Sequence, residues 1–207
     1  MIEAAQKIRR GRKFAQVLDG AREIFLRDGF SGASVDDIAR AAGVSKATLY
    51  SYFADKRLMF AEMARAECAR QADEAEALID PSAPLEAVLL EGARRFVELV
   101  TSDFSVRIFR ICAAEADRFP ELGRAFYESG PLLARARLGA FFREAMLRGD
   151  LAITDVDMAA DQFAALCKAG AFERVAFGAG PPPGPAEVDR IARAAVATFL
   201  ARYAVRG

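Results

Sequence analysis

The chain has 207 residues, enough for one large domain or two small ones with a sizeable core. Hydrophobic residues make up 53% and charged residues 28%, a composition that excludes a disordered chain. Basic and acidic residues both number 29, yet residues 1–57 hold 11 basic and 7 acidic ones, and the remainder is correspondingly acidic. This asymmetry favours contact with nucleic acid at the basic N-terminal end.

The sequence contains no histidine, which excludes whole classes of site. A Ser-His-Asp triad, a Cys-His pair, a histidine zinc site and a Glu-x-x-His di-iron bundle all require that residue. Cys68, Cys112 and Cys167 lie far apart and form no C-x-x-C, so we expect no disulfide framework and no thiolate zinc site. We predict three small buried thiols, no metal and no other cofactor. No signal peptide or membrane-spanning apolar run is evident, so we expect a cytoplasmic protein with no membrane partner.

Apolar residues recur at helical spacing along nearly the whole chain, as at Ala21, Ile24 and Phe25. No period-2 alternation of β-branched residues is evident, so we predict an all-α fold. Residues 1–13 are polar and basic, and the stretch GAGPPPGP at 178–185 is typical of a stiff connector. The predicted helices span 14–28, 35–41, 46–52, 56–79, 85–101, 104–118, 120–147 (with a disturbance at Gly130-Pro131), 156–177 and 187–205.

The stretch SVDDIARAAGVSKATLYSYF, residues 34–53, carries the most information on function. Ser34 and Ser45 are predicted N-caps of two short helices, and Gly43 suits the left-handed backbone of a tight turn between them. The two helices share an apolar face, formed by Ile38, Ala39, Ala42, Val44, Leu49 and Phe53. The second helix exposes Lys46, Thr48, Tyr50, Ser51 and Tyr52, and its tyrosines suit donation to phosphate oxygens. We predict a helix-turn-helix whose second helix enters the major groove, with a plain helical hairpin as the alternative.

The longer stretch GASVDDIARAAGVSKATLYSYFADKRLMFAEM resembles the N-terminal signature of TetR/AcrR-type transcriptional regulators over its whole length. The resemblance implies that Ala47 and Ser51 face base edges. Because both side chains are small, base recognition would rest on methyl contacts, one hydroxyl or DNA shape. The resemblance also implies phosphate contacts from Ser34, Ser45, Lys46, Thr48, Tyr50, Tyr52 and Lys56.

Just before the first helix, residues 6–13 read QKIRRGRK, with five basic residues among eight. We predict an arm that tracks the DNA backbone or enters a minor groove, with a solvated disordered tail as the alternative. Either form would steepen the salt dependence of DNA binding.

The segment FRICAAEADRFPELGRAFYESGPLLARARLGAFFREAMLRGDL, with MAADQFAALCKAG after it, is similar to the C-terminal domain of the AefR-like subgroup. In the family this part binds a ligand and forms a dimer. The predicted helix 156–177 is apolar on almost every side, and helix 187–205 carries alanines that allow close approach. We predict a homodimer through a two-fold four-helix interface of this pair, with a large monomeric core as the alternative.

Eleven of the 16 phenylalanines lie at Phe96 or later, which favours an apolar or aromatic ligand for the C-terminal part. Arg107, Arg110 and Glu115 are possible anchors for a polar end of that ligand. Each predicted pocket residue has an alternative role in the core. The predicted pocket comprises Phe96, Phe104, Ile108, Cys112, Phe126, Phe141, Phe142, Phe163 and Cys167.

These observations together predict a basic arm at 1–13, a helix-turn-helix DNA-binding domain at 14–55 and a ligand-binding and dimerisation domain at 56–207. The predicted function is that of a ligand-responsive regulator, a repressor that binds palindromic operator DNA as a homodimer and is released by a small molecule. Two alternatives remain. One is an enzyme that uses carboxylates such as Glu115 and Asp117, although positions i and i+2 diverge on a helix. The other is an interaction module that has lost DNA binding.

Overall fold

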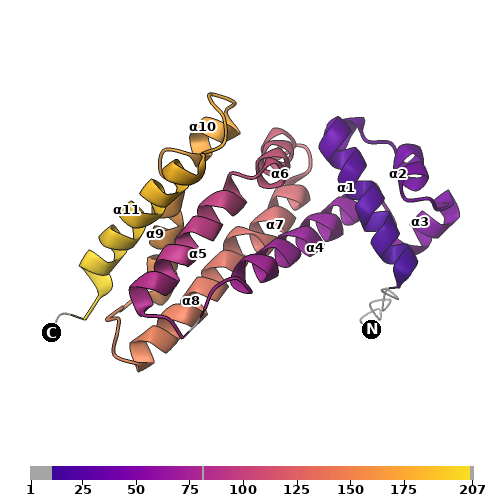
Figure 1. Ribbon diagram of the computed structural model, residues 1–207. Coiled ribbons are helices and arrows are strands. Elements are labelled where there is room, and N and C mark those ends of the chain that lie inside the picture. The colour runs from indigo at the N-terminus through magenta and orange to yellow at the C-terminus, as the bar shows by residue number, and fades with distance from the viewer. Residues whose placement is uncertain (1–10, 81, 206–207) are drawn as a thin grey trace. The chain divides into compact units, whose positions relative to one another are not determined.

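The computed structural model describes residues 11–80 and 82–205 of the chain. This described part contains only helices and one isolated antiparallel bridge, between Leu151 and Ala204 (Figure 1), which confirms the predicted all-α fold. The helices are α1 (Arg12–Gly32), α2 (Val35–Ala41), α3 (Lys46–Tyr52), α4 (Lys56–Glu76), α5 (Leu85–Val100), α6 (Asp103–Ala114), α7 (Pro120–Ser129), α8 (Pro131–Leu147), α9 (Val156–Lys168), α10 (Phe172–Ala176) and α11 (Pro185–Tyr203).

Several helix boundaries differ from those predicted. The expected helix 120–147 divides into α7 and α8 at the predicted disturbance, where Gly130 has non-helical backbone angles. The expected helix 156–177 is wrong as a single element: α9 ends at Lys168, and Gly170 adopts a left-handed φ of 77° before α10 begins. Glycine reaches this region without the steric cost of a Cβ atom, so the chain can turn there.

The described residues form two compact units. The first comprises the described chain up to Ala66 together with Ile111–Phe126, and the second comprises Glu67–Arg110 with Tyr127 onward. The boundary therefore falls inside α4, α6 and α7.

A cluster of phenylalanines closes the core of the first unit. Phe25 stacks on Phe30 at 5.9 Å, and Phe60 meets both rings edge-on at 5.1 and 5.6 Å. All three side chains are buried. Aromatic pairs in these geometries add to the free energy gained by burying their area.

A glycine allows α1 to approach the helix-turn-helix closely. A Cβ atom placed on Gly20 would lie 2.6 Å from the backbone nitrogen of Ala42 and 2.8 Å from its Cβ. No side chain larger than hydrogen fits at such distances. Gly20 therefore sets the separation between α1 and the end of α2.

The second unit is built around four helices that pack on one another, α5, α8, α9 and α11 (Figure 1). Its centre is a group of aromatic rings: Phe142 stacks on Phe199 at 4.7 Å, and Phe163 meets both rings edge-on. Tyr203 continues the group and donates its hydroxyl hydrogen to Gln162 at 2.6 Å. The cluster gives this unit one continuous core.

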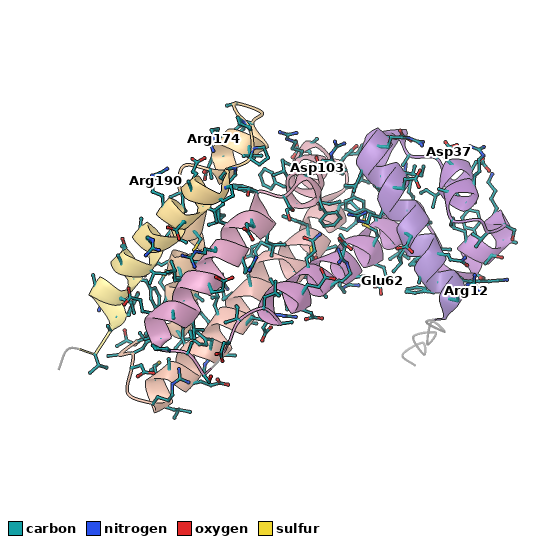
Figure 2. All side chains as sticks on the ribbon, in the orientation of Figure 1. Arg12, Asp37, Glu62, Asp103, Arg174 and Arg190 are labelled. Carbon is teal, nitrogen blue, oxygen red and sulfur yellow. The ribbon has the colours of Figure 1, made fainter. Side chains whose placement is uncertain are left out.

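Ion pairs between helices surround that core. Arg94 on α5 donates to Asp189 on α11, and Arg135 on α8 donates to Asp161 on α9. Figure 2 shows how densely charged side chains follow the helices. Exposed pairs of this kind contribute little individually, so their main effect is to fix which helix faces which.

The three cysteines are free. Cys112 and Cys167 are buried, as predicted, whereas Cys68 is only half-buried. Burial raises the pKa of the Cys167 thiol to about 12, which keeps it protonated and unreactive at neutral pH.

Candidate nucleic-acid interface

The residues predicted to form a helix-turn-helix do so with the expected boundaries. Helices α2 and α3 cover the predicted residues 35–41 and 46–52, and Gly43 between them has a φ of 62°. The amide of Val44 donates to the carbonyl of Ala39 at 3.0 Å, which closes the turn. Five of the six predicted shared apolar residues are buried; Val44 is half-buried.

Both short helices are capped by the predicted serines. The Oγ atom of Ser34 accepts a hydrogen bond from the amide of Asp37, and that of Ser45 accepts one from the amide of Thr48 at 3.1 Å. The Ser34 hydroxyl also donates to the Asp37 carboxylate, and this bond, with a second from Arg40, lowers the pKa of Asp37. Such caps stabilise helices too short to persist alone.

The predicted DNA-facing residues of α3 divide into two groups. Lys46, Ala47, Tyr50 and Ser51 are exposed, with Tyr50 at 51%. Thr48 and Tyr52 are half-buried. The Tyr52 ring meets Phe14 of α1 edge-on at 5.6 Å, so this tyrosine also anchors α3 to α1.

The ammonium group of Lys46 forms an ion pair with a carboxylate of the same chain. Its Nζ lies 2.7 Å from Asp36 at the start of α2, and that hydrogen bond is the main cause of the raised pKa of Lys46. Both side chains are more than half exposed, so the pair lies open to solvent and a phosphate can compete with Asp36 for the lysine.

Lys56 at the start of α4 has an internal structural role. Its Nζ donates to the carbonyls of Phe30 and Ala33, at 2.7 and 3.0 Å, and lies 4.7 Å from the centre of the Phe30 ring. Burial lowers the pKa of this lysine. Two of the three N–H groups of the ammonium are therefore engaged inside the first unit, and its predicted phosphate contact stays a prediction.

Most of the predicted basic arm lies outside the described residues, which begin at Gly11. The last two residues of the arm, Arg12 and Lys13, are the first two of α1 rather than part of a free segment. Figure 2 shows Arg12 at the start of that helix.

The predicted pocket residues are distributed over both compact units. Phe142, Phe163 and Cys167 are buried in the core of the second unit, with Phe96 and Phe141 packed half-buried against it. Two further residues, Phe104 and Ile108, are buried on α6. The remaining two, Cys112 and Phe126, belong to the first unit.

A hollow of about 450 Å³ lies instead on the outer face of the α9–α11 pair, and none of the nine predicted pocket residues lines it. Its floor includes Phe199 and Tyr203 of the core. Its apolar walls include Ala165, Leu166 and Ala169 of α9.

The three predicted polar anchors are engaged within the protein. Arg107 pairs with Asp103 on its own helix at 2.8 Å, and Glu115 accepts a hydrogen bond from Ser31. Arg110 donates to the carbonyls of Val175 and Ala176. These contacts hold all three side chains within the protein.

Sequence reasoning missed two residues that shape the interface, Gly20 and Asp36. A glycine inside a helical pattern costs stability and often has a packing reason, so Gly20 offered a signal. Asp36 gave none, because its contact with Lys46 depends on how the turn brings α3 back to the start of α2.

No helix in the described part of the chain is long and apolar enough to cross a membrane. Among the same residues, no three or more Cys, Asp or Glu side chains gather in a way that would hold a metal ion.

Two family profiles match most of the chain. The profile described as "Bacterial regulatory proteins, tetR family" matches residues 17–63, and the one described as "AefR-like transcriptional repressor, C-terminal domain" matches residues 87–205. The first includes α2 and α3, and the second covers more than half of the sequence.

Similarity to individual known proteins supports the same family. The chain is 31% identical to a TetR-family transcriptional regulator from Mesorhizobium loti, covering 94% of this chain and 98% of that one with a TM-score of 0.85. It is 36% identical to the flavonoid-responsive regulator FrrA, covering 95% and 100% of the two chains with a TM-score of 0.80. The repressor AcnR of Corynebacterium efficiens is 36% identical over 58 residues, which span 28% of this chain and 31% of AcnR. The chain therefore belongs to the TetR family of DNA-binding transcriptional regulators, a family of regulators rather than enzymes, and carries an AefR-like C-terminal domain.

Proposed function

We propose that this regulator is a repressor that binds palindromic operator DNA as a homodimer and is released by a small apolar or aromatic ligand. The observation that carries the proposal is the exposed polar face of α3, which is capped, short and free of large apolar side chains other than Tyr50.

DNA recognition follows from that face. Tyr50 and Ser51 present hydroxyl groups. Lys46 would exchange its ion pair with Asp36 for one with a DNA phosphate. Ala47 is exposed and small, so it allows α3 to lie close to the base edges. Ser34, Ser45, Thr48, Tyr52 and Lys56 are proposed to contact the flanking phosphates.

A homodimer through α9 and α11 supplies the second recognition helix. The outer face of this pair carries exposed small residues and the hollow, whereas its inner face packs into the core of the second unit. Isologous pairing of this face would place two α3 helices on two half-sites of a palindrome.

An aromatic effector is supported by two observations. The second unit is rich in phenylalanine around Phe96, Phe141 and Phe142. FrrA, which is 36% identical over almost the whole chain, is described as flavonoid-responsive. We propose a site formed by rearrangement of the aromatic cluster of the second unit, lined by those predicted residues that lie in this unit, Phe96, Phe104, Ile108, Phe141, Phe142, Phe163 and Cys167. Because linkage is reciprocal, ligand and DNA would weaken each other's binding by one factor.

Fluorescence anisotropy on DNA from upstream of the regulator's own gene tests DNA binding, with a salt series and scrambled competitor. Tyr50→Phe removes a hydrogen bond to a charged phosphate in each half-site, so we expect affinity to fall about tenfold or more. Lys46→Ala should reduce the salt slope by about 1.8 for two lost phosphate contacts, at about 0.9 for each.

Tyr127→Phe is the matched control, because Tyr127 lies in the second unit and is 48% exposed, close to the value for Tyr50. It should leave affinity unchanged. If genome-wide selection yields no specifically bound fragment, or if Tyr50→Phe with Lys46→Ala binds like the wild type, the proposed DNA interface is wrong. Where specific binding is found, release of the bound DNA by flavonoids and other planar aromatics would identify the effector class.

A further inference from the structure

The most exposed aromatic side chain of the second unit is Phe177, at the end of α10. Its ring is 84% exposed. The two residues before it, Val175 and Ala176, are buried, so the segment is packed onto the unit up to the residue that points away from it.

Several contacts hold this short helix in place. Arg110 of α6 donates to the carbonyls of Val175 and Ala176 at 2.7 and 2.8 Å. Phe172 packs edge-on against Phe109 at 5.2 Å, and Arg174 pairs with Glu187 of α11 at 2.9 Å. Figure 2 shows Arg174 at this position, between α10 and α11. A tethered backbone loses little conformational entropy when its exposed ring is bound, which favours affinity.

The hollow between α9 and α11 offers a complementary surface. Its walls are chiefly apolar, and Phe177 of the same chain is not among the residues that line it. Arg202 lies at the hollow with its guanidinium 4.9 Å from the centre of the Tyr203 ring. An inserted aromatic ring would therefore meet Phe199 below it and a cation beside it.

Along α11 the hollow lies toward the end opposite α10, whereas along α9 it extends to Ala169, three residues before α10 begins. Helices α9 and α11 are antiparallel, since Leu151, just before α9, pairs with Ala204, just after α11. Figure 1 shows α10 at the end of α11 opposite the C-terminus. The hollow reaches α11 at Thr198–Tyr203, so its centre lies about 22 Å from the start of α11 at 1.5 Å per residue.

A two-fold axis perpendicular to α11 near its middle reverses the direction of that helix in a second copy. It therefore brings the α10 end of one copy over the C-terminal half of α11 in the other, and the contact occurs twice. We propose that Phe177 of each copy inserts into the α9–α11 hollow of a second copy, so that two reciprocal aromatic anchors close the dimer. This inference rests on the proposed homodimer and names its central contact.

Disulfide cross-linking between two distinguishable copies tests the contact directly. One preparation carries Phe177→Cys and a size tag, the other carries Ala169→Cys in the wall of the hollow, and both carry Cys68→Ser to remove the half-buried native thiol. After subunit exchange and mild oxidation, we expect a covalent heterodimer. The matched control replaces Ala169→Cys with Leu147→Cys, because Leu147 is 88% exposed and lies outside the hollow. This pair should cross-link at least about tenfold more slowly.

A second measurement uses no introduced thiol. Sedimentation equilibrium of Phe177→Ala should show a dimer dissociation constant raised about tenfold or more, as when a central aromatic anchor is removed, with unchanged helicity. Leu147→Ala should shift that constant less than about twofold.

The outcomes separate this inference from the proposed function. A dimer that forms no Phe177-to-hollow cross-link, or that Phe177→Ala leaves unchanged, overturns the inference and leaves the homodimer standing. A chain that stays monomeric at all concentrations, on and off DNA, overturns both. An apolar small molecule bound in the hollow of an intact dimer also overturns the inference, since it shows that Phe177 does not occupy the hollow.

Discussion

The helix-turn-helix of this regulator and the core of its second unit differ in the size of the side chains on which they depend. Helix α3 buries only Leu49, and the turn that leads into it begins at Ala42, which α1 approaches closely at Gly20. The second unit fills its centre with stacked and edge-on rings around Phe142. The helix-turn-helix therefore depends on the spacing between helices, whereas the second unit depends on packed volume.

The substitution with the largest expected effect, Phe142→Ala, disrupts the aromatic core of the second unit. Phe142→Ala leaves a cavity beside Phe163 and Phe199, so the free energy of unfolding should fall by about 3–5 kcal/mol. Urea denaturation followed by circular dichroism measures this loss. Leu147→Ala, on the same helix but exposed, should change it by less than about 0.5 kcal/mol. A Phe142→Ala variant as stable as Leu147→Ala would contradict the central role given to these rings.

A second substitution tests the dependence of the first unit on spacing. Gly20→Ala places a methyl group 2.6 Å from the Ala42 nitrogen, so we expect a loss of about 1–3 kcal/mol in stability together with weaker operator binding. Gly123→Ala in α7 of the same unit has open space around it and should instead gain about 0.5–1 kcal/mol, because alanine favours the helix over glycine. Denaturation and anisotropy on both variants give the comparison; equal effects from the two would show that close approach is not the cause.

The smallest expected effect on stability concerns the ion pairs around the core of the second unit. Hydrogen bonds from Arg193 and Arg94 lower the pKa of Asp189, so its carboxylate stabilises the folded state at pH values above its unfolded pKa of about 3.9. This contribution is lost as the pH falls through the lower folded value. Asp189→Asn should therefore melt below the wild type at pH 7, and the difference should vanish at the acid end of a pH series.

Asp157→Asn is the control for that series, because Asp157 is exposed and its ion pair with Arg143 is long, at 3.4 Å. It should melt like the wild type at every pH. A constant difference between Asp189→Asn and the wild type down to the lowest pH would show that the stabilisation does not come from the carboxylate charge.

Sequence reasoning succeeded where structure depends on neighbours in the chain. The boundaries of α2 and α3 follow from Ser34, Ser45 and Gly43, each of which acts within four residues of its own position. The all-α fold and the shared apolar face follow from periodicity for the same reason.

Contacts between distant residues were not predictable in this way. The end of α9 before Gly170 and the capping of α10 by Arg110 depend on how helices meet, because the apolar pattern continues through the break. The predicted pocket residues were chosen by their apolar character, which core residues such as Phe163 share with ligand contacts. Composition alone cannot separate the two.

The ion pair between Lys46 and Asp36 also bears on how the regulator finds its operator in a genome. An unpaired lysine on the recognition helix would attract any stretch of duplex and hold the protein there. The internal carboxylate instead supplies that attraction within the protein, so a phosphate must displace Asp36 before the lysine contributes. Random DNA, which offers few other contacts, gains little from this exchange. In the proposed DNA complex, the ion pair would therefore reduce what Lys46 adds to binding at wrong and right sites alike, by about 1 kcal/mol or less for an exposed pair.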